Sequence, residues 1–381
     1  MDTFKIVVFG CWNKGCRENS GQQSVSNLIK LNEYKYEFMV ILGDNYYAEK
    51  KTIINNRESK FKIKLTNINE LKKGFSCLEN INLEKKLIMG NHDVEDSLDK
   101  GCSILKSQLK LPWYDVKFPF GFDMYYLYGN EQNSYNKTIL FIYLDTTLYS
   151  SDINDNNSCY KSVLNKDINT LKQEQNSFIT STLKLIENKI YNISNVVFFG
   201  HEPLLTFKQK KEKKIALVVP DLLEILFEEK NKYTDTGFHW ICADYHVYQN
   251  SIISNNSDPK LNITDPKLNI TQWIFGTGGG ELDKPVNDTD LVVGNYELKI
   301  LPNIVFDSRD VNISDKFNDT IGLDRFGYGE ITFDLCSVSH KFILSDYDFN
   351  KSVGSNNKSL FDYKTKYFKY KNKYIGLKNI I

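Results

Sequence analysis

The sequence predicts a layered α/β fold, in which strands buried on both faces alternate with amphipathic helices. Nine apolar runs of strand length recur along the chain, and most of them are continuous rather than alternating. Continuous apolarity is typical of strands that are covered on both faces by helices or by a second sheet. Helical patterns lie between these runs, which completes the α/β interpretation.

The predicted strands follow one another from the N-terminus to the region near residue 345. They cover residues 4–10, 37–44, 85–93, 138–146, 195–203, 239–249, 272–281, 328–335 and 340–347. Two helices are predicted between them, at 20–34 and 174–190, because capping residues or a helical stripe of apolar side chains mark each segment. The stripes consist of Val25, Leu28 and Ile29 in the first helix and of Phe178, Leu183 and Ile186 in the second.

Composition and charge exclude several classes of protein. The 381 residues include 48 basic and 48 acidic side chains, so the overall field selects neither a nucleic acid nor a membrane as the main partner. No apolar segment reaches the length of a membrane-spanning helix, and residues 1–10 do not form a signal peptide, so we expect a cytoplasmic protein without a transmembrane segment. The seven scattered cysteines predict reduced thiols rather than a disulfide framework.

We expect a single domain over residues 1–350. Two segments, at 150–162 and 254–271, have the composition of surface insertions, and the second contains DPKLNIT twice in tandem. Residues 351–381 form a basic, tyrosine-rich tail with Tyr363, Tyr367, Tyr370 and Tyr374 at helical spacing. Two interpretations of the tail stay open: its tyrosines dock on the domain, or the tail contacts a partner or an anionic surface.

Polar side chains with metal-binding chemistry follow five of the predicted strands. Three of the five histidines lie just past a strand, each beside an aspartate, asparagine or glutamate. The carboxyl ends of strands in an α/β sheet converge on one crevice, so a metal site is the simplest explanation. The residues concerned are Cys11, Asp44, Tyr47, Asn91, His92, His201, Asp244 and His246.

The motifs GDNYY, GNHD, GHEP and DYHVYQ, in this order, resemble the signature of calcineurin-like metallophosphoesterases. The GDNxY form and the later FGTGGGE strand are similar to the purple acid phosphatase branch in particular. The motifs run from residue 10 to about 282, and GYGEITFD extends them to about 334. The resemblance implies a four-layer αββα sandwich of two mixed sheets flanked by helices, with two metal ions at the strand ends.

The resemblance also implies a role for each residue. Asp44 would bridge both ions, and Tyr47 and His246 would bind the first ion. Asn91 and His201 would bind the second. His92 would contact the substrate phosphate or protonate the leaving group, and a metal-bound hydroxide would attack the phosphorus.

Two positions depart from the family pattern. Cys11 stands where the family has an aspartate ligand, and Asp244 stands where it has the first histidine of GHxH. Thiolate and carboxylate are both competent metal ligands, so we expect a rebuilt site, with one or two ions and with iron, zinc or manganese as the metals.

The sequence therefore predicts a metal-dependent phosphatase acting on small phosphate monoesters. Two alternatives stay open: a phosphodiesterase or nucleotidase on the same fold, and a noncatalytic pseudophosphatase that serves as a binding module. A serine hydrolase is not supported, because the chain has no GxSxG motif.

Overall fold

The structure is a computed structural model. It describes residues 3–12, 20–47, 50–55, 58–63, 68–95, 102–128, 136–150, 153–156, 158–210, 213–256, 268–279, 282–283, 290–307, 309–317, 323, 325–335 and 337–345. Residues 1–345 make up one compact unit. The tail predicted at 351–381 lies outside the described residues, and so does 257–267 of the predicted insertion at 254–271.

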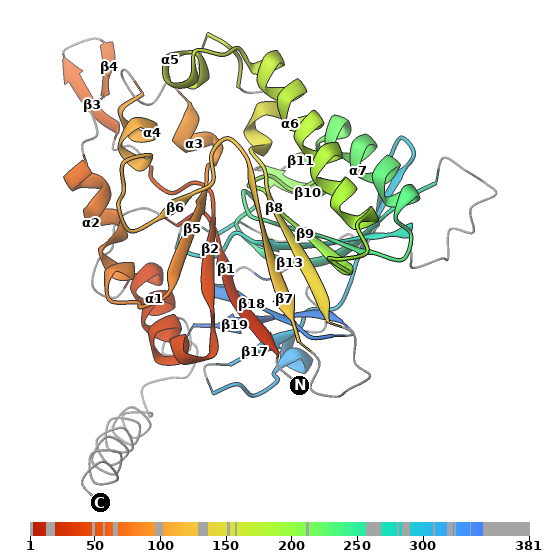
Figure 1. The fold of residues 1–381 in the computed structure, drawn as a ribbon. Coiled ribbons are helices and arrows are strands. Elements are labelled where there is room, and N and C mark those ends of the chain that lie inside the picture. Colours follow the sequence, from red (N-terminus) through yellow and green to blue (C-terminus); the bar gives the residue numbers. More distant parts are fainter. Residues whose placement is uncertain are drawn as a thin grey trace, which may run out of the picture. The chain divides into compact units, whose positions relative to one another are not determined.

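Two mixed β-sheets form the centre of this unit (Figure 1). The first has the order β17-β19-β18-β1-β2-β5-β6 and the second the order β15-β16-β13-β14-β12-β9-β8-β7. The strands of the first sheet are β1 (Phe4–Phe9), β2 (Phe38–Leu42), β5 (Glu84–Ile88), β6 (Asp115–Val116), β17 (Val305–Phe306), β18 (Gly327–Phe333) and β19 (Val338–Leu344). Those of the second are β7 (Gly121–Leu127), β8 (Lys137–Tyr143), β9 (Ile193–Phe199), β12 (Gly237–Cys242), β13 (Tyr248–Asn255), β14 (Ile270–Phe275), β15 (Asp290–Val293) and β16 (Tyr296–Ile300).

Helices and two separate hairpins complete the described elements. The α-helices are α1 (Gly21–Asn32), α2 (Ile68–Glu79), α3 (Asn91–Val94), α4 (Ser103–Gln108), α5 (Tyr160–Leu164), α6 (Ile168–Leu183) and α7 (Pro220–Lys232). Short 3-10 helices are η1 (Glu33–Lys35), η3 (Thr146–Tyr149), η4 (Lys184–Glu187) and η6 (Ser314–Phe317). The hairpins pair β3 (Lys50–Asn55) with β4 (Glu58–Ile63) and β10 (Leu205–Lys210) with β11 (Lys213–Val218). No helix in the described ranges is both long enough and apolar enough to cross a membrane.

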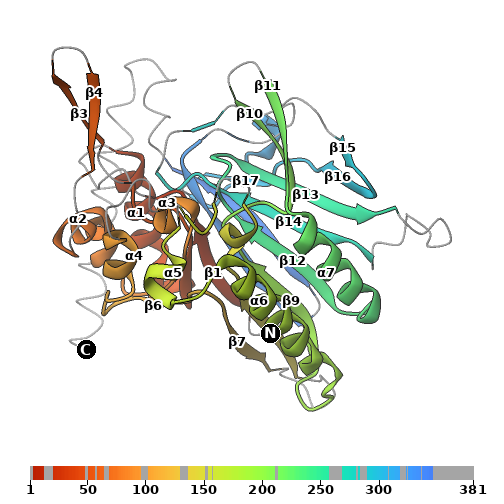
Figure 2. The same cartoon turned by 90° about the horizontal axis from the view of Figure 1, so that it is seen from above.

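Four layers result from the alternation of side chains along the strands. In β1, Ile6 and Val8 face the second sheet, where they join a core that contains Phe141 and Phe199. The residues of β1 that alternate with these two face the opposite side of the sheet and pack on α1 and α2. On the far side, the outer face of the second sheet packs against α6 and α7 (Figure 2). The predicted α/β class and the four-layer sandwich are therefore confirmed.

The predicted helices form, although one of them has different bounds. Ser20 caps α1, and the stripe of Val25, Leu28 and Ile29 is buried as expected. The second helix begins at Ile168, earlier than predicted, because the Asp167 side chain accepts a hydrogen bond from the backbone N–H of Thr170 at 2.7 Å. The N-cap thus lies upstream of the apolar stripe from which the helix was predicted.

The expectation that all the thiols are reduced is wrong: Cys77, Cys102 and Cys159 are disulfide-bonded, and among the described cysteines Cys11 and Cys242 carry thiols. Cys102 and Cys159 form a disulfide across a sequence separation of 57 residues. The two cysteines meet because the Cys159 N–H donates to the carbonyl oxygen of Val94 at 2.8 Å and Glu95 bridges to Ser158. The disulfide thereby ties α4 to the start of α5, next to α3. Disulfides are rare in the cytosol, so the cysteines no longer support a cytoplasmic location.

Removal of this disulfide should destabilise the protein measurably. Crosslinking residues this far apart restricts the unfolded chain, which contributes about 4 kcal/mol on the loop-entropy account. A Cys102→Ser/Cys159→Ser variant should therefore unfold at lower denaturant concentration than the oxidised wild type. Wild-type protein treated with reductant should shift in the same direction, and an unchanged midpoint in both samples would contradict the bond.

His239 is a structural histidine held neutral between the two sheets. Its Nδ1 lies 2.6 Å from Thr271 Oγ1, its Nε2 lies 3.1 Å from Asn195 Oδ1, and its ring stacks on Trp273. Burial, assisted by the charge of Lys230, lowers the pKa of His239 to about 3.

The low pKa of His239 predicts a loss of stability in acid. A histidine in the unfolded chain titrates near pH 6.5, whereas His239 in the folded protein titrates at about pH 3. Its contribution to the free energy of unfolding is therefore complete above pH 6.5 and falls by about 1.4 kcal/mol per pH unit between pH 6.5 and about pH 3. Between pH 7 and pH 5, a His239→Gln variant should lose about 2 kcal/mol less unfolding free energy than the wild type. Denaturant titrations at both pH values measure this difference, and equal losses would contradict the assignment.

Candidate functional site

Five strands from both sheets end at one place and carry the predicted site residues. β1, β2 and β5 run parallel in the first sheet, and β9 and β12 run parallel in the second. Backbone hydrogen bonds join the loops that follow them: Cys11 N–H donates to Gly43 O at 3.1 Å, and Ala243 N–H donates to His201 O at 2.8 Å. The strand ends therefore form one continuous floor for the site.

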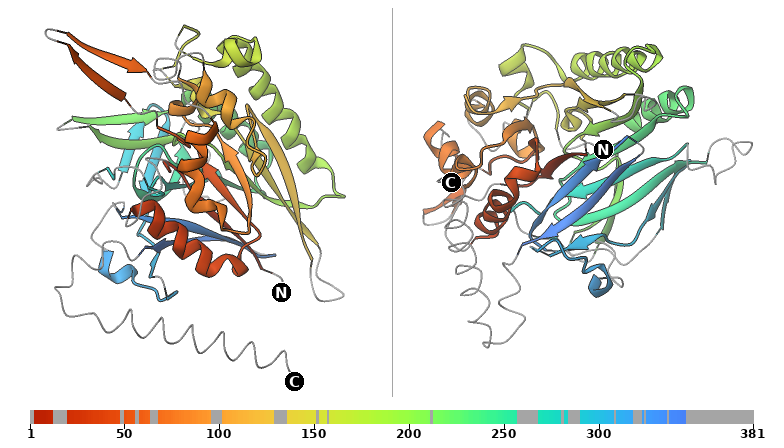
Figure 3. Two further views of the ribbon diagram at one scale, coloured as in Figure 1. Left: turned by 90° about the vertical axis from the view of Figure 1, so that its left-hand side faces the viewer. Right: turned by 60° about the horizontal axis from the view of Figure 1, so that its bottom comes forward.

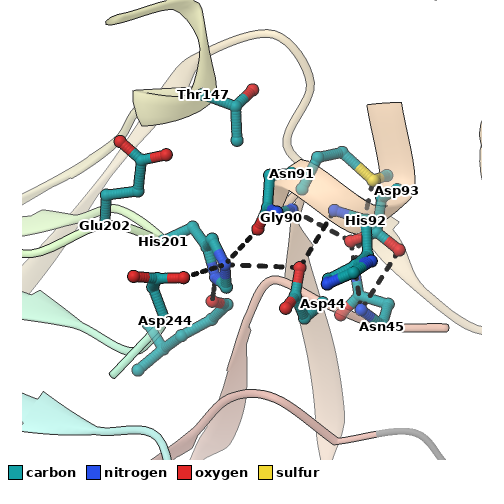
Figure 4. A network of polar contacts seen from close by, with 12 residues as sticks. Asp44, Asn45, Gly90, Asn91, His92, Asp93, Thr147, His201, Glu202 and Asp244 are labelled. Carbon is teal, nitrogen blue, oxygen red and sulfur yellow. Dashed lines mark hydrogen bonds and ion pairs between the residues drawn. The ribbon is translucent and has the colours of Figure 1, made fainter. Parts of the chain in front are cut away.

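His201 lies at the centre of this floor and is completely buried. Its Nδ1 lies 2.7 Å from the carbonyl oxygen of Leu42, which can only accept, so Nδ1 carries the proton. Its Nε2 then presents a lone pair to Asn91 Oδ1 at 3.2 Å and to Asp44 Oδ1 at 3.3 Å (Figure 4). His201 Nε2, Asn91 Oδ1 and Asp44 Oδ1 are therefore three hydrogen-bond acceptors that face one another. Either a second proton on the imidazole or a bound cation is needed to hold them together.

The two carboxylate oxygens of Asp44 face different groups. Oδ1 faces His201 Nε2, and Oδ2 accepts a hydrogen bond of 2.8 Å from the Tyr47 hydroxyl. The same hydroxyl lies 3.4 Å from His246 Nε2. Ligand atoms of Cys11, Asp44 and His246 all lie within 4.8 Å of one another. Asp44 thus connects two clusters of possible metal ligands.

Asp244 belongs to the His201 side of the site. Its Oδ1 lies 3.8 Å from His201 Nε2, and its side chain is 21% exposed. The carboxylate therefore occupies a position from which it can bind the same cation as His201 and Asn91. Asp244 thus places a carboxylate oxygen beside His201.

His92 is the second residue of α3 and lies beside these clusters without entering them. Its backbone N–H donates to Asp44 Oδ1 at 3.2 Å, and its ring centroid lies 4.6 Å from that of Tyr47. The side chain is half-buried, unlike that of His201. Its imidazole can therefore reach a molecule that lies over the site.

Three of these residues adopt strained backbone conformations. Cys11, Asp44 and Asp244 have φ angles of 54°, 53° and 49°, in the left-handed region that residues with a Cβ rarely adopt. Such strain costs about 1–3 kcal/mol per residue and persists mainly at functional sites, where the surrounding structure imposes it. This shared left-handed conformation turns the backbone sharply at the end of each of the three strands.

Gly43 leaves room for the His201 ring. Its φ is 83°, and a Cβ at this position would lie 2.6 Å from His201 Nδ1. A side chain there would displace the imidazole from Leu42 O. Glycine is thus required in GDNYY for a steric reason as well as a conformational one.

Several buried or half-buried carboxyl groups of the site resist ionisation. Burial, together with the charge of Asp44, raises the pKa of Asp93 to about 7. Burial raises the pKa of Asp145 to about 6, and burial with the charge of Asp244 raises that of Glu202 to about 8. Burial is the main cause of all three shifts, and repulsion by a neighbouring carboxylate adds to those of Asp93 and Glu202. A bound cation would relieve that repulsion.

Asp44 and His201 shift each other's pKa. Burial opposes the ionisation of Asp44, but His201 and His92 outweigh it and hold the pKa of Asp44 below its usual value. Burial likewise lowers the pKa of His201, but Asp44 and Asp244 outweigh it and raise that pKa. Burial and the nearby Asp44 charge raise the pKa of Tyr47 well above its usual value, so ionisation of the phenol requires a cation.

Sequence reasoning missed two groups that hold the site loops in place. Thr146 Oγ1 accepts hydrogen bonds from the backbone N–H groups of His201, at 3.1 Å, and of Glu202, at 2.8 Å. The strand-end rule could have found Thr146, because it is the last residue of the predicted strand TILFIYLDT. Asp93 accepts from the N–H of Asn45 at 3.0 Å and from Gln108 Nε2 at 2.7 Å. No signal in the sequence marks Gln108.

The glycine-rich segment after β14 packs closely on the end of β1. Gly278 N–H donates to the carbonyl oxygen of Gly10 at 3.1 Å, next to Cys11. This contact agrees with close packing at a strand end. Residues 280 and 281 of the same motif lie outside the described ranges.

Comparisons with known proteins support the fold. No family model and no curated protein matches the sequence. Among solved structures, GAP50, the anchor in the inner membrane complex of Plasmodium, is similar with 10% identity and a TM-score of 0.52 over 90% of this chain and 85% of that chain.

Two further solved structures match with lower TM-scores. PhoD matches with 12% identity and a TM-score of 0.49, over 90% of this chain and 69% of that chain. The calcineurin-like phosphoesterase YfkN from Bacillus subtilis matches with 9% identity and a TM-score of 0.36, over 98% of both chains. At these identities the comparisons concern the fold, and the chain shares the fold of GAP50 over most of its length.

Proposed function

We propose that the chain is a metal-dependent phosphoesterase of the purple acid phosphatase type that hydrolyses phosphate monoesters at a binuclear site. The arrangement of Asp44 carries this proposal. Its two carboxylate oxygens face separate ligand clusters, Oδ2 toward Tyr47 and Oδ1 toward His201, as a carboxylate that bridges two cations would.

The donor atoms fit two different ions. Cys11, Tyr47 and His246 would supply sulfur, phenol oxygen and imidazole nitrogen to the first, and Asn91, His201 and Asp244 would supply oxygen and nitrogen to the second. Asp44 would complete both sets. Sulfur and imidazole ligands favour zinc or iron over magnesium, and manganese fits the oxygen-rich second set.

The residues of the chain would divide the work as follows. Two cations, when bound, would offset the negative charge of the phosphate and acidify a water molecule. Leu42 O holds the proton on His201 Nδ1, which keeps Nε2 available as a ligand. His92, half-buried beside Tyr47, would contact the phosphate or donate a proton to the leaving oxygen.

An activity panel tests the proposal. Purified protein would be assayed with p-nitrophenyl phosphate, a monoester, and with bis(p-nitrophenyl) phosphate, a diester, in the presence of Mn, Zn, Fe or Mg and after chelation. We expect metal-dependent hydrolysis of the monoester that chelation abolishes. Faster hydrolysis of the diester would favour the phosphodiesterase alternative.

A noncatalytic binding module remains the second candidate. Asp244 and Cys11 both replace the family's usual ligands, and GAP50, which shares the fold, is described as an anchor. This candidate predicts protein that purifies without metal and shows no hydrolysis with any of the four metals. Elemental analysis of protein purified without added metal separates the two functions.

A further inference from the structure

One disulfide connects the two segments that support the second set of metal ligands. Cys102 directly precedes α4, Cys159 directly precedes α5, and both residues are buried. Figures 2 and 3 show α4, in orange, beside α5, in yellow-green. From each end of the disulfide, buried polar side chains lead to a different ligand of this set, Asn91 on one side and His201 on the other.

The connection from α4 runs through Gln108, which is the last residue of that helix and is completely buried. Its Nε2 donates to Asp93 Oδ1 at 2.7 Å. Asp93 Oδ2 accepts from two backbone N–H groups, those of Gly90 at 2.9 Å and of Asn45 at 3.0 Å. Gly90 directly precedes one proposed ligand and Asn45 directly follows another. Gln108 therefore orients the carboxylate that joins two ligand-bearing loops.

The connection from α5 runs through Tyr160, which follows Cys159 and is also completely buried. Its hydroxyl donates to Asp145 Oδ2 at 2.8 Å. Asp145 is the N-cap of η3, and Thr146 is the first residue of that helix. Thr146 Oγ1 accepts from the backbone N–H of His201 at 3.1 Å. Tyr160 therefore fixes the segment to which the His201 loop is bound.

We propose that Gln108 and Tyr160 are positioning residues for the second set of metal ligands, and that the Cys102–Cys159 disulfide holds both of them in place. Each donates to a carboxylate that organises a site loop, and neither is itself a proposed ligand. The disulfide fixes the starts of α4 and α5 relative to each other, so it supports both connections. This inference rests on the proposed function, because it requires a cation in the second set.

Manganese titration of the full chain tests the inference without any substrate. Protein loaded with about one equivalent of zinc would be titrated with Mn²⁺, and free Mn²⁺ would be measured by its electron paramagnetic resonance signal. Gln108→Met and Tyr160→Phe each remove the donor and keep much of the side-chain volume. Each should weaken manganese binding about 10-fold or more, as replacement of residues that orient ligands does. Tyr328→Phe is the control, because it removes a buried hydroxyl on the outer side of the first sheet, and it should bind like the wild type.

A Cys102→Ser/Cys159→Ser variant tests the part played by the disulfide. It should weaken manganese binding in an otherwise wild-type chain but add less than about twofold to the loss in a Gln108→Met/Tyr160→Phe chain, because both changes act through the same contacts. A merely structural role would lower the melting temperature and leave manganese affinity unchanged. Single variants within about twofold of the wild type, or additive losses in the combined variant, would overturn the inference alone. A wild type that binds no manganese would overturn the proposed binuclear site as well.

Discussion

An Asp44→Asn variant is expected to lose metal-dependent hydrolysis almost completely. The substitution keeps the shape of the side chain but removes the negative charge that lies between the two ligand clusters. With one bridging charge gone, both cations would bind more weakly and the remaining ligands would repel less. We expect kcat/KM to fall on the order of 10³-fold or more, which corresponds to about 4 kcal/mol of transition-state free energy.

Steady-state kinetics and elemental analysis on the same preparation measure this loss. Asp221→Asn is the matched control, because its carboxylate is 60% exposed on α7, and it should behave like the wild type. Folding of the Asp44→Asn variant would be verified by circular dichroism. A folded variant that retains wild-type hydrolysis would show that Asp44 does not bridge catalytic metal ions.

Replacement of Cys11 should remove the thiolate from the first set of ligands and weaken metal binding there. A thiolate ligand binds cobalt with a sulfur-to-metal charge-transfer absorption that oxygen and nitrogen ligands do not produce. Cobalt-substituted wild-type protein should show this absorption, and the Cys11→Ala variant should lose it together with about one equivalent of zinc or iron. This readout does not depend on turnover.

Cys242→Ala provides the control for the cobalt experiment. Cys242 is also a fully buried cysteine, but it packs in the core between the second sheet and its covering helices. Its replacement should leave the absorption intact. If both variants keep the absorption, Cys11 is a core residue and the first site is formed by the other ligands alone.

The strand ends of the site could be predicted from the sequence because each apolar run stops at a polar residue. This pattern predicts Asp44, His201 and His246, and the structure brings both histidines next to Asp44. The sequence could not show which oxygen of Asp44 faces which cluster, because that depends on the left-handed turn at Asp44 and on the packing of Gly43. Local pattern locates a residue along the chain, but tertiary packing orients its side chain.

Contacts between distant segments account for what the sequence did not reveal. Gln108 reaches Asp93 only because α4 packs beside α3, and no local pattern records that contact. The hairpins were also missed as elements. Their strands mix lysines with isolated apolar residues, so neither the continuous run nor the clean alternation of a buried strand is present.

The bond between Cys102 and Cys159 affects how the protein must be produced for any of these experiments. Two electrons have to pass to an oxidant while the chain folds, and a reducing bacterial cytosol supplies none. Material made there would reach the assay with the neighbourhood of Asn91 and His92 less restrained, so an inactive preparation could reflect the expression host rather than the enzyme. Secretion into the periplasm or refolding in a glutathione buffer avoids this ambiguity.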